Sequence, residues 1–289
     1  MRFVACALIY GVIMERKLIS RGFEHFLKQN FPLMQNKVIK HILFSIIGIY
    51  GMDKIYDKVY DLHSDLSFVD KFLHIKNVKL KVSDEQLALI PTKGPLLIVA
   101  NHPYGAIEGL AMMSLLKRVR SDMKLMVNFV LRDIPELHDD LVLVDSLGDK
   151  NKSRNSLGGV RATVKYLNNG HVIGVFPAGK VSVYNRKENK VTDLQWSKFV
   201  GTLAQRVKCD VQCMFFEGRS SNFSQFLGIM NPILQLLWVA REFLNFSNKS
   251  LTVRIGEVIS SEICETYQTS EDLIDFLRNK TYSLSEKDT

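Results

Sequence analysis

The chain has 289 residues, of which 46% are hydrophobic, so one large or two small folded domains are expected and global disorder is excluded. The formal net charge of +8 favours an anionic partner, namely a phospholipid surface, a nucleic acid or an acidic carrier protein. The four cysteines lack the spacing of a zinc site, so they are expected to be buried thiols and no metal site is predicted.

Residues 1–64 are expected to form an N-terminal helical region that associates with a membrane. The apolar runs at 3–14 and 42–52 are shorter than the roughly 20 residues of a membrane-spanning helix. Basic residues between these runs are typical of helices that lie on an anionic lipid surface. An ordinary helical subdomain packed on the main domain explains the same pattern equally well.

Residues 65–289 are expected to form an α/β domain, a mixed sheet flanked by helices. Apolar runs of strand length alternate there with helical patterns. Strands are predicted at 78–82, 96–100, 124–131, 141–145, 171–176, 211–218 and 251–259. Helices are predicted at 110–119, 158–170, 197–207, 232–244 and 269–284. The stretch 226–240 is apolar on nearly all sides, which favours a core helix, although such a helix can also face lipid.

Three glycine-containing segments follow or overlap the ends of predicted strands: NHPYGAIEG at 101–109, FPAGKVS at 176–182 and FFEGRSS at 215–221. Loops at the ends of strands in one sheet can meet in space, so the three are expected to line a single pocket. Backbone N–H groups in the second segment are suited to holding an anion or an oxyanion.

His102 is the candidate general base, because an imidazole can take a proton from an attacking hydroxyl near neutral pH. Glu108 is the candidate carboxylate that orients this imidazole and stabilises its charged form. For the pair taken alone, the simpler alternative is a turn histidine and an acid favoured by a helix dipole.

Together and in this order, the motifs N-H-P-x-G-x-x-E-G, F-P-A-G-x-x-S and F-E-G-R-x-S resemble those of the PlsC-like glycerolipid acyltransferases. More narrowly, they resemble the branch that contains proteins named hemolysins and lyso-ornithine lipid acyltransferases, over roughly residues 65–260. The resemblance implies that His102 is the base, that Glu108 orients it, and that acyl carrier protein or coenzyme A carries the acyl thioester, with no other cofactor. It implies substrate-binding roles for Asn101, Gly105, Arg132, Phe176, Pro177, Gly179, Ser182 and Arg219.

The chain departs from the usual pattern of that superfamily in ways that bear on the acceptor. Glu108 replaces the usual aspartate, at the longer spacing of the narrower branch. In the usual F-P-E-G-T-R-S loop, Ala178 replaces the glutamate and Val181 the arginine, whereas Lys180 keeps a positive charge nearby. A glycerol phosphate favours a bidentate cation, so the missing arginine favours a lyso-aminolipid acceptor over lysophosphatidic acid.

Two other activities remain open on the sequence: a 1-acylglycerol-3-phosphate acyltransferase, and a catalytically inactive membrane-binding homologue. The basic residues are scattered and form no recognised binding motif, so no nucleic-acid partner is predicted. The expected partners are the acyl thioester carrier, a lyso-lipid acceptor and an anionic membrane surface. The expected location is the cytoplasmic face of the inner or plasma membrane, as a peripheral or monotopic protein.

Overall fold

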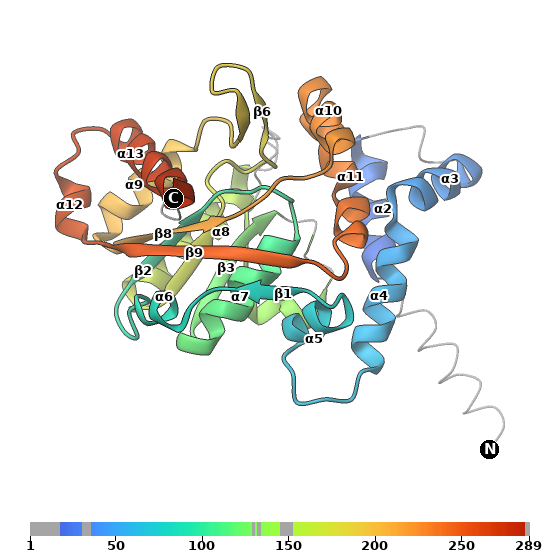
Figure 1. Ribbon diagram of the computed structural model, residues 1–289, viewed down its shortest axis with the longest axis horizontal. Helices are drawn as coiled ribbons and strands as arrows, with labels where there is room; N and C mark the ends of the chain where they lie inside the picture. Colours follow the sequence, from blue (N-terminus) through green and yellow to red (C-terminus); the bar gives the residue numbers. More distant parts are fainter. Residues whose placement is uncertain (1–17, 31–35, 129–130, 132–133, 145–152, 287–289) are drawn as a thin grey trace.

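A seven-stranded sheet of order β1-β9-β8-β2-β5-β3-β4 forms the centre of the computed structural model, which describes residues 18–30, 36–128, 131, 134–144 and 153–286 (Figure 1). Neighbouring strands are parallel except for β8 and β9, which run antiparallel, so the predicted mixed α/β sheet is confirmed. The strands are β1 (Lys79–Lys81), β2 (Leu96–Ala100), β3 (Met123–Asn128), β4 (Leu141–Val144), β5 (Val172–Val175), β8 (Asp210–Phe216) and β9 (Ser250–Ile259).

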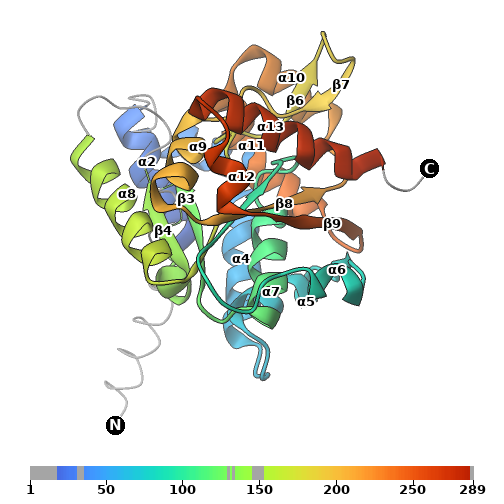
Figure 2. The ribbon, with the colours of Figure 1, turned by 90° about the vertical axis from the view of Figure 1, so that its left-hand side faces the viewer.

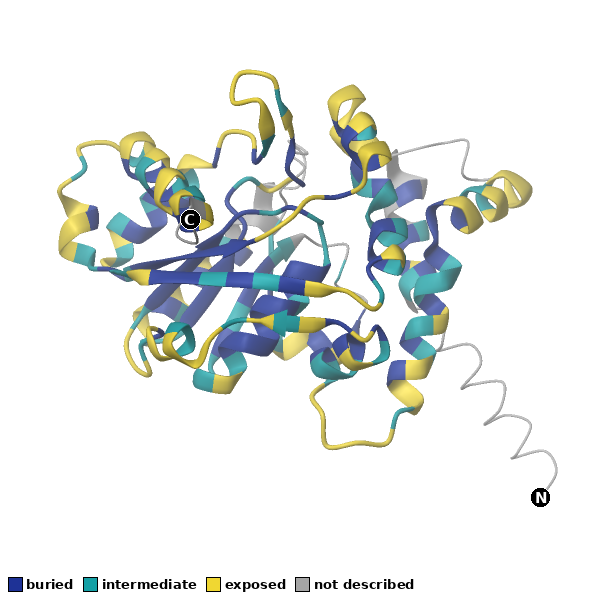
Figure 3. Cartoon of the chain, in the orientation of Figure 1, coloured by how far each residue is buried: buried dark blue, intermediate teal, exposed yellow. Residues whose placement is uncertain are grey.

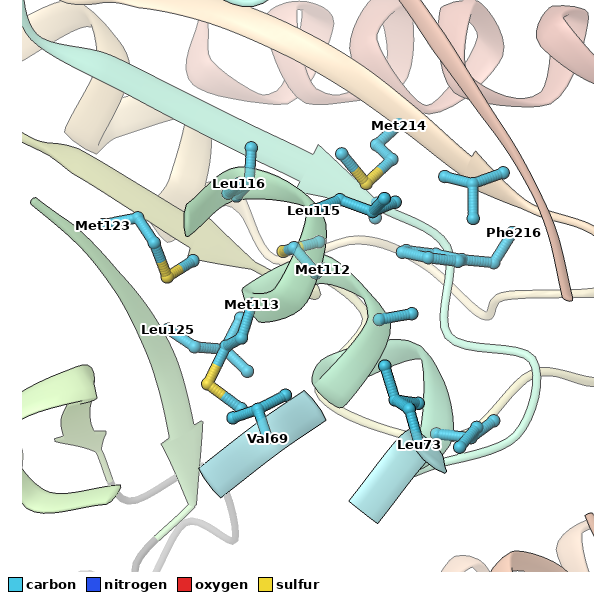
Figure 4. Packing of buried hydrophobic residues seen from close by; sticks show 14 of the residues in the cluster. Val69, Leu73, Met112, Met113, Leu115, Leu116, Met123, Leu125, Met214 and Phe216 are labelled. Carbon is cyan, nitrogen blue, oxygen red and sulfur yellow. The ribbon is translucent and has the colours of Figure 1, made fainter. Parts of the chain in front are cut away.

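Helices cover both faces of this sheet and bury its apolar strands (Figures 1 and 2). One face packs against α4 (Ile49–Asp61), α5 (Phe68–Ile75) and α7 (Ile107–Val119); the other packs against α8 (Ser153–Asn168), α9 (Lys198–Val207) and α13 (Ser270–Ser283). Between α7 and the sheet the core contains four methionines: Met112 and Met113 on α7, Met123 on β3 and Met214 on β8 (Figure 4). Thioether side chains suit such irregular core spaces because they are unbranched and flexible.

The N-terminal helices α2 (Leu18–Asn30), α3 (Lys37–Ile47) and α4 pack beside α11 (Pro232–Asn245) through a cluster that contains Phe44 and Leu237. The apolar run 42–52 is divided at Gly48, which has a left-handed φ of +89°. This residue is both the C-cap of α3 and the N-cap of α4. The run 3–14 lies outside the described residues. None of the described helices is both long and apolar enough to cross a membrane. The division at residue 64 stays a prediction.

The stretch 226–240 spans two helices, and the helix predicted to begin at Pro232 is confirmed as α11, with Leu237 and Phe243 buried on its inner face. Asn231 ends α10 (Asn222–Met230), and its side chain caps α11, which begins at Pro232. Proline fits the first position of a helix but not its interior, so the chain breaks there. The outer face of α10 is exposed, with Phe226 at 56% and Met230 at 61% (Figure 3).

The remaining elements are short. The hairpin of β6 (Val183–Asn185) and β7 (Lys190–Thr192) follows β5 and was not among the predicted strands. Two short helices, α6 (Asp84–Ala88) and α12 (Ser261–Glu265), lie between strands and helices of the main domain, and 3₁₀ turns occur at Pro135–Asp140 and Leu284–Glu286.

Candidate active site

Three loops meet beyond the carboxyl end of β2: the histidine turn (101–106), the β5 loop (176–182) and the β8 loop (217–221). The backbone N–H of Ser182 donates to the carbonyl of His102 at 2.8 Å. The backbone N–H of Ser220 donates to the carbonyl of Pro103 at 3.0 Å. The histidine turn is therefore fixed on both sides by the other two predicted loops.

Glu108 is the buried acid beside His102. It lies in the first turn of α7 with its side chain fully buried, and its Oε1 is 3.0 Å from Nδ1 of His102. The two atoms do not have the geometry of a directed hydrogen bond, so the contact is an electrostatic one that becomes an ion pair when the imidazole is protonated. The same oxygen accepts the backbone N–H groups of Tyr104 at 2.8 Å and Gly105 at 2.7 Å.

The carboxylate of Glu108 is held in its charged form. Burial alone would raise the pKa of Glu108, but the charge of His102 and the hydrogen bond from Gly105 hold that pKa below its ordinary value. A buried anion facing one ring nitrogen stabilises the imidazolium that forms when the other nitrogen takes a proton. The pair therefore has the chemical character of a general base and its orienting acid.

Phe176 supports the imidazole from one side. Its ring stacks on that of His102, with centroids 4.3 Å apart and planes 22° apart, and the His102 side chain stays 17% exposed. Pro177 is buried and its carbonyl accepts from Ser197, which begins α9. Gly179 is exposed at the tip of the β5 loop with φ of +61°.

Asn101 and Gly105 have structural partners that sequence reasoning missed. Asn101 exchanges two hydrogen bonds with the main chain of Phe216, at 2.9 and 2.7 Å, and so extends the pairing of β2 with β8. Gly105 has φ of +94°, and a Cβ there would lie 2.7 Å from Val239 and 2.8 Å from Val181. A side chain at this position would be strained and crowded.

Ser182 is buried, and its hydroxyl donates to Asp193 at 2.5 Å. Its carbonyl accepts from two buried amides, Gln225 on α10 and Gln235 on α11, at 3.1 and 3.3 Å. Ser182 therefore links the histidine turn to these two helices, and Asp193 enters the site as a residue that the sequence motifs did not single out as functional.

The β8 loop brings Arg219 beside the histidine turn. Its backbone N–H contacts the Tyr104 hydroxyl, and Arg219 is exposed. Arg132 lies outside the described residues. Within the described part of the chain, no group of three or more His, Cys, Asp or Glu residues is arranged to hold a metal ion.

Comparison with known proteins shows one matching family profile, described as Acyltransferase, over residues 52–288. The lyso-glycine lipid O-acyltransferase of Phocaeicola vulgatus is 27% identical over 212 residues, 71% of this chain and 73% of that protein. The lyso-glycine lipid O-acyltransferase of Bacteroides thetaiotaomicron is 25% identical over 231 residues, 77% and 79% of the two chains. The crystal structure of PlsC, the 1-acyl-sn-glycerophosphate (LPA) acyltransferase of Thermotoga maritima, is 15% identical with a TM-score of 0.46, and covers 88% of this chain and 96% of its own.

Proposed function

The chain belongs to the acyltransferase family, and from that premise we propose that it transfers a fatty acyl chain from a thioester to the hydroxyl of a lyso-aminolipid such as lyso-glycine or lyso-ornithine lipid. The observation that carries the proposal is the buried Glu108 carboxylate 3.0 Å from the partly exposed His102. Both sequence relatives are named for acylation of a lyso-glycine lipid.

In the proposed mechanism His102 acts as the base through Nε2, because Nδ1 faces Glu108. Nε2 takes the proton of the acceptor hydroxyl as its oxygen bonds to the thioester carbonyl carbon. The tetrahedral intermediate then collapses, the carbon–sulfur bond breaks, and the thiolate takes the proton from the imidazolium. The products are the acylated lipid and the free thiol of the carrier, and no acyl-enzyme forms.

The β5 loop supports an acceptor without a phosphate. Val181 is a buried apolar residue that lies against Gly105, at the position where the resemblance places a phosphate-binding arginine. Lys180 is exposed at the tip of the loop and does not supply a bidentate cation. Phe176, Pro177, Gly179 and Arg219 remain our candidates for contacts with the acceptor and the thioester.

We also propose that the protein binds an anionic membrane peripherally, on the cytoplasmic face, through the exposed apolar side chains of α3 and α10. Ile42 on α3 is 53% exposed, and α10 carries Phe226 and Met230 (Figure 3). Arg241 on α11 donates to the carbonyls of Ser45 and Ile46 at 2.6 and 2.9 Å, which holds α3 beside α11, and α11 in turn packs against α10. Burial of such side chains in lipid is favourable, and basic residues on α3 add attraction to anionic headgroups.

The experiment that tests the enzymatic proposal is acyl transfer from labelled acyl carrier protein and coenzyme A thioesters to a panel of lyso-lipids. The panel contains lyso-glycine lipid, lyso-ornithine lipid and lysophosphatidic acid. We expect transfer to the aminolipids, loss of transfer in a folded His102→Ala variant, and unchanged transfer in His74→Ala, whose exposed side chain lies on α5. Preference for lysophosphatidic acid would refute the acceptor class, and equal activity of His102→Ala would refute the base.

Flotation with anionic vesicles at low salt tests the membrane proposal. Ile42→Ser combined with Met230→Ser is expected to reduce the bound fraction. The control is Ile263→Ser on α12, a similarly exposed apolar residue (46%) at the other end of the molecule (Figure 1). Equal loss of binding in the control, or no binding by the unmodified chain, would refute this surface.

A further inference from the structure

Asp193 is a buried carboxylate in direct contact with the histidine turn. It follows β7 and is 1% exposed. Its Oδ1 accepts the backbone N–H of His102 at 3.1 Å and the hydroxyl of Ser182 at 2.5 Å. Its Oδ2 accepts the indole N–H of Trp196 at 2.8 Å. One side chain thus joins the histidine turn to the β5 loop and to the segment that leads into α9.

The partners of this carboxylate favour its charged form. A backbone N–H and an indole N–H can only donate, so they match an ionised carboxylate. Burial raises the pKa of Asp193 above its ordinary value, and the hydrogen bonds from Ser182, His102 and Trp196 offset only part of that rise. Burying an anion is costly unless donors or an opposite charge compensate for it, so its retention beside a base needs a reason.

Nearby cationic groups do not neutralise the carboxylate directly. Arg278 on α13 donates to the main-chain carbonyl of Asp193 at 2.9 Å. The Tyr282 hydroxyl, also on α13, accepts the backbone N–H of Asp193 at 2.6 Å, and Lys190 on β7 lies over the Tyr282 ring. Among the described side chains, no lysine or arginine forms an ion pair with the Asp193 carboxylate. The His102 imidazole, once it has taken a proton, adds a positive charge whose attraction lowers the pKa of Asp193.

We propose that Asp193 is a second carboxylate of the active site, a positioning residue that fixes the backbone of His102 and favours its imidazolium form. This inference rests on the proposed role of His102 as the base. Glu108 on α7 faces the ring of His102, whereas Asp193 holds its backbone N–H. Removal of the Asp193 charge alone is therefore expected to weaken the base, because an asparagine Oδ1 can still accept from His102 and Ser182 and keep the two loops joined.

The test removes the charge with little change of shape. Asp193→Asn alone can place an amide N–H₂ against the indole N–H, so the variant is also made in a Trp196→Phe background, where that donor is absent. The comparison is Asp193→Asn/Trp196→Phe against Trp196→Phe. The matched control is Asp210→Asn, because Asp210 also accepts a backbone N–H, that of Ser261 at 2.9 Å, at the far end of β8.

The readouts are kcat, KM for both substrates, and an NMR titration of the His102 imidazole that needs no turnover. We expect kcat to fall about 10- to 100-fold, KM to change less than about twofold, and the titration midpoint to move down by about 1–2 pH units. Asp210→Asn is expected to change none of these values. An unchanged midpoint, an unchanged kcat or a loss confined to KM would overturn the role of Asp193. If the unmodified chain transfers no acyl group, the proposed function fails, and the NMR midpoint still decides the question of Asp193.

Discussion

Replacement of Glu108 separates the charge of this residue from its role in holding the histidine turn. Glu108→Ala removes the acceptor of two part-buried backbone N–H groups, those of Tyr104 and Gly105. Each unsatisfied donor costs about 1–3 kcal/mol, so the free energy of unfolding is expected to fall by about 2–6 kcal/mol. Glu108→Gln keeps one carbonyl oxygen for these donors. Its amide N–H₂ would take the place of Oε2, which is buried without a partner among the described residues, so the free energy of unfolding is expected to fall by about 1–3 kcal/mol.

Both substitutions remove the anion beside His102, so both are expected to lower kcat by about 10²- to 10⁴-fold. The assays are urea unfolding followed by circular dichroism and acyl transfer under conditions where each variant is folded. Wild-type kcat in Glu108→Gln would show that the charge is not needed. Equal stability of the two variants would show that the hydrogen bonds to the turn do not stabilise it.

Three further predictions follow from the contacts. Gly105→Ala is expected to cost about 2–5 kcal/mol in urea unfolding, from the left-handed φ and the two methyl contacts, with partial recovery in Gly105→Ala/Val239→Ala. Hydrogen bonds from Arg120 and His171 lower the pKa of Asp122 to about 2. The ionised carboxylate therefore stabilises the fold above its ordinary pKa of 3.8, and this stabilisation is lost as the pH falls toward 2. In urea unfolding, Asp122→Asn should lower the free energy of unfolding at pH 7 but change it little at pH 2. Asn101→Ala leaves two main-chain groups of Phe216 unpaired and should cost about 2–4 kcal/mol in the same assay, and Asn101→Asp should cost at least as much, because a buried carboxylate would face the Phe216 carbonyl oxygen.

The sheet was predictable from the sequence because its strands are short apolar runs, as expected for parallel strands covered on both faces. The start of α8 was harder to predict from the sequence. We placed it at Gly158, whereas the helix begins at Ser153. Position 159 lies inside the helix and requires a glycine, because a Cβ there would be 2.3 Å from the Leu143 carbonyl oxygen. No local sequence pattern indicates this close approach of α8 to β4.

The candidate pair of the site could be predicted because His102 and Glu108 lie within seven residues of sequence and carry a recognisable motif. Asp193 could not be assigned a role in the same way. It follows a three-residue strand, and its partners at His102 and Tyr282 are 91 and 89 residues away in the chain. The role of Asp193 depends on contacts between segments that are distant in the chain.

The fixing of the histidine turn by later segments has a consequence for biosynthesis. The carbonyls of His102 and Pro103 are held by Ser182 and Ser220, and β2 lies between β5 and β8 in the sheet. A growing chain that has emerged only as far as α7 holds the candidate base and its candidate acid but none of these later partners. Such long-range contacts must overcome the entropy of closing large loops, so they form late. Acyl transfer is therefore expected to begin only after the ribosome has released the β8 segment, and a product truncated before Ser220 should lack activity even if its first strands are folded.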